Sequence, residues 1–81
     1  MIKLKKHSEI QTLYPGIIYI IRATPADAFS DESDKNFYIV EVVDRNKKDG
    51  RAYSTTLTTM DAAELKEAIG VKKKEKLVIN A

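Results

Sequence analysis

The hydrophobic and polar positions of this 81-residue chain follow the spacing of β-strands over much of its length. Residues 17–21 are all β-branched or aromatic, and residues 37–45 form a second strand with apolar side chains on both faces. Such strands are normally covered on both sides. Residues 1–5 instead alternate Ile2 and Leu4 with charged or terminal positions, which is typical of a half-buried or edge strand.

A β-hairpin is predicted after the second long strand. Residues 47–50, Lys-Lys-Asp-Gly, have the composition of a four-residue hairpin loop. Closing this loop between Asn46 and Arg51 places Tyr53 and Leu57 on the core side of the sheet. A register shift of one residue would turn both side chains to the other face.

The second half of the chain contains the clearest helix signal. Residues 58–69 repeat apolar side chains at helical spacing, a threonine or Asp61 is the N-cap, and Gly70 ends the helix. A short last strand is expected over residues 76–81.

Two further segments have weaker patterns. Residues 7–14 fit either a turn of helix capped by Ser8 or a loop. A helix of one or two turns is predicted to begin at Thr24 and Pro25, since threonine is a good N-cap and proline suits the first helical position.

This order of elements predicts an α+β fold class within one domain of 81 residues. We expect a small, mainly antiparallel sheet or a partly open barrel of four to five strands, with one helix in the C-terminal half. The chain has no cysteine, no signal-peptide pattern and no apolar run long enough for a membrane span, so we expect a cytoplasmic protein.

Charge is unevenly distributed although the net charge is only +2. Residues 23–34 contain no basic residue, whereas four of the five charged residues among residues 1–22 are basic. We expect this acidic segment to bind a basic site of a partner by imitating nucleic-acid charge, through four side chains: Asp27, Asp31, Glu32 and Asp34.

The residue types required for catalysis are scarce. His7 is the single histidine and there is no cysteine, so acid–base and nucleophilic groups are few. The acidic residues lack the spacing of a calcium loop, and each glycine is explained by a turn or a cap. We therefore predict no enzyme, no metal site and no cofactor.

Two binding functions remain open. The first is docking on a partner protein or self-association as a dimer. Two strands have apolar residues on both faces, and only one helix, with a narrow apolar stripe, is predicted to cover them. Such a module would regulate or inhibit its partner without chemistry. The alternative is a single-stranded or structured nucleic acid, bound by basic turns and a strand aromatic: Lys47, Lys48, Arg51, Lys72, Lys73, Lys74 and Tyr53.

Overall fold

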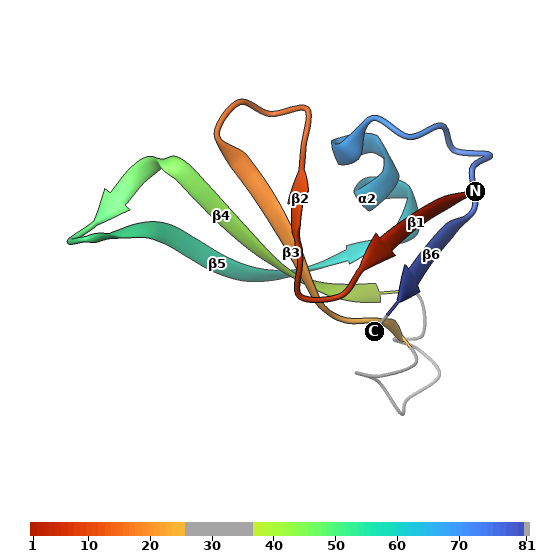
Figure 1. Cartoon of the computed structure of the whole chain (residues 1–81), viewed down its shortest axis with the longest axis horizontal. Coiled ribbons are helices and arrows are strands. Elements are labelled where there is room, and N and C mark those ends of the chain that lie inside the picture. Colours follow the sequence, from red (N-terminus) through yellow and green to blue (C-terminus); the bar gives the residue numbers. More distant parts are fainter. Residues whose placement is uncertain (26–36, 81) are drawn as a thin grey trace.

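An open four-stranded antiparallel sheet forms the centre of the molecule (Figure 1). The computed structural model describes residues 1–25 and 37–80. In spatial order the sheet consists of β2 (Glu9–Gln11), β3 (Ile17–Ala23), β4 (Phe37–Asp49) and β5 (Ala52–Asp61). The expected α+β class and antiparallel sheet are confirmed, whereas the alternative of a barrel is not adopted because the sheet does not close.

A second, two-stranded sheet joins the two ends of the chain. β1 (Ile2–Lys5) and β6 (Leu77–Asn80) run parallel, with Leu4 beside Ile79. Both strands were predicted, but their parallel pairing was not. Parallel neighbours depend on a long connection, so a short sequence pattern cannot reveal them.

One face of the four-stranded sheet carries the hydrophobic core. We call it the core face. Buried residues from β2, β3, β4 and the helix form the cluster, and Leu4, Leu77 and Ile79 of the small sheet pack against it. The buried members are Ile10, Tyr19, Ile21, Val40, Leu65 and Ala68.

Helix α2 (Ala62–Ile69) contributes Leu65 and Ala68 to the core. The Oδ1 atom of Asp61 accepts a hydrogen bond from the Glu64 backbone N–H at 2.8 Å, so Asp61 is the N-cap. The helix ends at Gly70, whose φ of +77° is readily adopted by glycine. The predicted start at residue 58 was wrong, because the threonines before Asp61 continue β5.

The segment over residues 7–14 is neither of the two structures expected for it. It contains β2, which pairs with β3 and places Ile10 opposite Tyr19. The polar–apolar–polar order of Glu9, Ile10 and Gln11 is consistent with a strand, but three residues are too few for the pattern to stand out. The predicted helix start at Thr24 lies at the edge of the described residues.

The β4–β5 hairpin differs from the predicted one in its loop and its register. Its turn consists of Gly50 and Arg51, between Asp49 and Ala52, and residues 45–47 form a bulge in β4 with no counterpart in β5. As a result Leu57 pairs with Glu41. The core-side prediction for Tyr53 and Leu57 was therefore wrong, and these side chains are 45% and 65% exposed.

Candidate functional site

The face of the sheet opposite the core contains an open apolar hollow. We call this face the outer face. The hollow has a volume of about 550 Å³ and is lined by Arg22, Ile39, Glu41, Thr55, Thr56 and Leu57. A neighbouring depression of about 480 Å³ shares Ile39 and Leu57 and adds Thr58 and Thr59. Leu57 thus stands between two depressions at the edge of the sheet.

Strand β5 is the edge strand beside this hollow. It is ten residues long, and within residues 1–25 and 37–80 only β4 pairs with it. An edge strand exposes unpaired backbone N–H and C=O groups that a further strand can use. Among the described residues, the outer-face hollow therefore lies next to a strand edge that no second neighbour covers.

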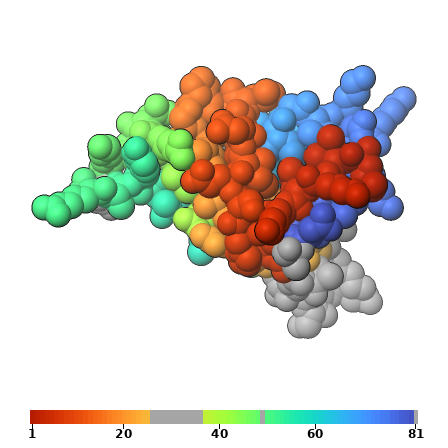
Figure 2. Space-filling view, viewed as in Figure 1, coloured from red at the N-terminus to blue at the C-terminus, as the bar shows by residue number. Residues whose placement is uncertain are grey.

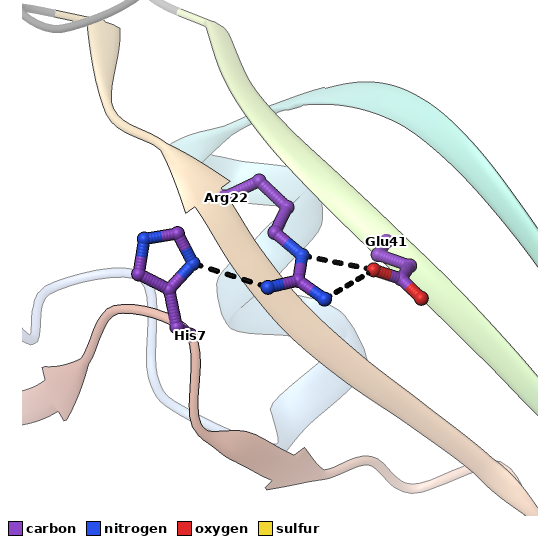
Figure 3. A network of polar contacts seen from close by, with 3 residues as sticks. All are labelled: His7, Arg22 and Glu41. Atoms are coloured by element: carbon purple, nitrogen blue, oxygen red, sulfur yellow. Dashed lines mark hydrogen bonds and ion pairs between the residues drawn. The ribbon is translucent and has the colours of Figure 1, made fainter.

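An ion pair crosses the outer face between β3 and β4 (Figure 3). The Arg22 Nε and Nη2 atoms donate to Oε1 of Glu41 at 2.8 and 2.6 Å. The register between β3 and β4 shifts between Ile21 and Ala23, so Arg22 lies at a bulge. Bulges redirect side chains, and this one accompanies an Arg22 side chain that reaches across to Glu41.

His7 completes this network from the turn before β2. Its Nδ1 atom lies 3.1 Å from Nη1 of Arg22. A guanidinium only donates hydrogen bonds, so Nδ1 accepts and the ring proton of neutral His7 resides on Nε2. The single histidine is exposed, and its contact with Arg22 holds it beside the ion pair. Arg22 and Glu41 are site residues that sequence reasoning missed.

The tip of the β4–β5 hairpin brings together four residues proposed for nucleic-acid binding, namely Lys47, Lys48, Arg51 and Tyr53. Gly50 and Arg51 form the turn, and the hairpin projects from the rest of the molecule (Figures 1 and 2). The Tyr53 ring has Lys48 Nζ at 5.8 Å and the Arg45 guanidinium carbon at 5.9 Å from its centroid. These are cation–π distances, so the exposed ring is in contact with cationic groups of its own hairpin.

The other predicted basic cluster lies elsewhere. Lys72, Lys73 and Lys74 are exposed in the turn between α2 and β6. That turn and the hairpin tip are at opposite ends of the longest dimension of the molecule, which is 38 Å (Figure 1). The two basic clusters therefore do not form one surface.

The acidic residues predicted to bind a partner, Asp27, Asp31, Glu32 and Asp34, lie outside the described residues. Within the described ranges, no group of three or more His, Asp or Glu side chains is arranged to hold a metal ion. In the same ranges no helix has the length and apolar character needed to cross a membrane.

No protein-family model, curated protein or solved structure matches the chain. Inferences about function therefore depend on the geometry of these surfaces.

Proposed function

We propose that this protein is a non-enzymatic interaction module that binds an extended segment of a partner protein along β5 and over the outer-face hollow. The observation that carries the proposal is Leu57, which is 65% exposed on β5, a strand with one edge that no other described strand pairs with. Contiguous exposed apolar surface is typical of binding sites, and Leu57 lines the same two depressions as Ile39.

Strand addition is the binding mode that fits this edge. A partner strand would use the free backbone groups of β5 for affinity, and its alternate side chains would enter the depressions on either side of Leu57. Two of the six residues that line the larger depression are charged, and Arg22 and Glu41 neutralise each other. The partner segment is therefore expected to present apolar side chains toward Ile39 and Leu57. By occupying this edge the module would regulate or inhibit its partner without chemistry.

The test is selection of binding peptides from a random library, followed by mapping of the bound peptide on the amide resonances of the protein. We expect selected peptides with alternating apolar residues that shift the β5 resonances. Replacing Leu57 by Glu should weaken their binding about tenfold or more, because a charge would be buried against the peptide.

The matched control is Leu13→Glu, since Leu13 is 66% exposed in the loop between β2 and β3. This variant should bind the peptides as the original protein does. Peptides that shift resonances away from β5, or that bind the Leu57→Glu variant with undiminished affinity, would contradict the proposal.

A second candidate is binding of single-stranded nucleic acid by the hairpin tip, supported by Tyr53 among cations at a projecting end of the molecule. Bases stack on exposed aromatic rings, and basic side chains contact the phosphates. A base would have to displace Arg45 or Lys48 from the ring face that each covers. The cluster at Lys72, Lys73 and Lys74 is too distant to join the same contact.

A salt titration with a labelled oligonucleotide tests this candidate. Affinity should fall steeply with salt and should be lost when Lys47, Lys48 and Arg51 are together replaced by Ala. The control replaces Lys72, Lys73 and Lys74, an equal number of positive charges, and should retain most of the affinity. Equal losses in the two triple variants would indicate non-specific attraction and exclude the hairpin as a site.

A further inference from the structure

A smaller hollow lies on the core side of the sheet, between α2, β3 and the loop before β3. Its volume is about 200 Å³, and its lining residues are Tyr14, Tyr19, Met60, Glu64, Glu67 and Ala68. We call it the tyrosine–glutamate hollow. It shares no residue with the outer-face hollow or the hairpin tip.

The two glutamates of this hollow have no cationic partner among the described residues. Glu64 and Glu67 are three positions apart on α2, so both side chains lie on the same side of the helix. The other three described glutamates each pair with a positive group, namely Glu9 with Arg45, Glu41 with Arg22 and Glu75 with the terminal ammonium. Glu64 and Glu67 are thus the two described glutamates without an ion pair, and both line one hollow of a protein with a net positive charge.

Tyr19 provides an independent indication of a ligand. Its side chain lines the hollow with only 6% of the residue exposed, and within the described part of the chain its hydroxyl makes no hydrogen bond. No fully buried side-chain nitrogen or oxygen in that part lacks a partner, so this hydroxyl must open to the space of the hollow. The ring of Tyr19 is therefore held in the core while its hydroxyl reaches the hollow, where it can bond a group that enters.

The phenol remains protonated at neutral pH. Burial raises the pKa of Tyr19 above its ordinary value of 10.0, and the nearby Tyr14 and Glu64 raise it further. The hydroxyl is therefore neutral, with both a proton to donate and lone pairs that accept.

We propose that the tyrosine–glutamate hollow binds one organic cation, an ammonium or guanidinium head, carried by a free amine or by a Lys or Arg side chain. The carboxylates of Glu64 and Glu67 and the hydroxyl of Tyr19 would accept its hydrogen bonds. The tyrosine rings would attract its charge. Pockets for drug-sized ligands span roughly 300–1,000 Å³, so this smaller hollow suits a single side-chain head. Met60 and Ala68 provide apolar contact for the methylene groups behind the charge.

The test is titration of the folded protein with small probes while the ring resonances of Tyr14 and Tyr19 are followed by NMR. The cationic probes are butylammonium, Nα-acetyl-lysine methylamide and Nα-acetyl-arginine methylamide. The neutral probe is the norleucine analogue, which keeps the chain and removes the charge. We expect the cationic probes to shift both rings in a salt-sensitive way and the norleucine analogue to leave them unchanged.

The variants locate the cation. Replacing Glu64 and Glu67 together by Gln should weaken binding about tenfold or more, because two charge-assisted hydrogen bonds are lost. Tyr19→Phe should cause a smaller loss and retain the ring. Glu9→Gln is the control, since it removes one carboxylate elsewhere and should leave binding unchanged.

The two sources of the cation are separated by the probes. Tighter binding of the acetylated amino-acid probes than of butylammonium would identify a protein side chain, and equal binding would identify the free amine head. Ring shifts equal for norleucine and lysine probes, no ring shift with any cation, or undiminished binding to the double Gln variant would each overturn the proposal. None of these results depends on peptide binding at β5, so the two proposals can fail separately.

Discussion

The two faces of the four-stranded sheet are built from neighbouring residues of the same strands, yet they differ sharply in cover. On the core face Ile21 and Val40 are 0% exposed. On the outer face Ile39 lines an open hollow and Leu57 is 65% exposed. Hydrophobicity of the residue does not account for this difference, since an isoleucine or leucine is present on both faces.

The difference arises from the elements that cover each face. Helix α2 and the β1–β6 pair supply Leu65, Leu4, Leu77 and Ile79 to the core face. The outer face instead carries the ion pair between Arg22 and Glu41 and the exposed threonines of β5. Part of the outer face is nevertheless buried. Ile18, which pairs with Gln11 and Val43, is only 3% exposed. A chain of this size has one helix in its described part, and that helix covers one face.

The largest effect is expected from a matched pair of substitutions in β3. Ile21→Ala should lower the free energy of unfolding by about 2–5 kcal/mol, because it leaves a cavity in the core. Ile20→Ala, one residue away on the half-buried outer face, should cost only about 1 kcal/mol. Urea denaturation measures both values. Equal losses would show that the two faces are covered alike and would contradict the difference described above.

The next effect concerns the helix that covers the core face. Asp61→Ala removes the side chain that accepts from the Glu64 N–H, and should cost about 1 kcal/mol, which for a chain of this length lowers the Tm by roughly 4–8 °C. Asp61→Asn retains the acceptor and is the control. If Asn and Ala destabilised equally, the cap would not be the source of the effect.

The stability of the protein should depend on pH in the alkaline range through Tyr38, which packs against the core. Burial raises the pKa of Tyr38 above its ordinary value of 10.0, so the folded state holds this proton more tightly than the unfolded chain does. Stability should be unaffected by this group below pH 10.0 and should fall as the pH rises through the folded-state pKa. Tyr38→Phe should reduce that fall in denaturant titrations across the alkaline range. A fall of unchanged size in the Phe variant would assign it to other groups.

The smallest effect is expected from the polar network of the outer face. Glu41→Gln removes the charge that pairs with Arg22, whose side chain is 41% exposed, and should cost about 0.5 kcal/mol or less. A double-mutant cycle with Arg22→Gln, repeated at high salt, measures the coupling. A coupling well above 1 kcal/mol would mean that the outer face is more shielded from water than its exposure indicates.

Local signals in the sequence predicted several elements correctly. The β-branched run at residues 17–21 lies within β3, and the alternation at residues 1–5 lies at β1. Asp61 was one of two proposed caps and Gly70 the proposed end of the helix, and both were confirmed. These features depend on side-chain period, capping and backbone preference within a few residues.

The candidate sites were less predictable. Lys47, Lys48, Arg51 and Tyr53 are close in sequence, so their clustering at a hairpin could be foreseen. The outer-face hollow could not, because Leu57 was assigned to the core. The tyrosine–glutamate hollow combines residues from a loop, two strands and a helix, and no local pattern links Tyr14 to Glu67.

The sequence by itself determined most of the strand segments, the presence of one helix in the C-terminal half and its end at Gly70, and that apolar strand surface is abundant. Only the tertiary structure decided which of that surface is covered. The bulge at residues 45–47 shifts the hairpin register and exposes Leu57, and the β1–β6 pair packs Leu4, Leu77 and Ile79 against the core cluster. The physical reason is distance along the chain: caps and periodicity act over a few residues, whereas register and cover depend on contacts between segments far apart in sequence.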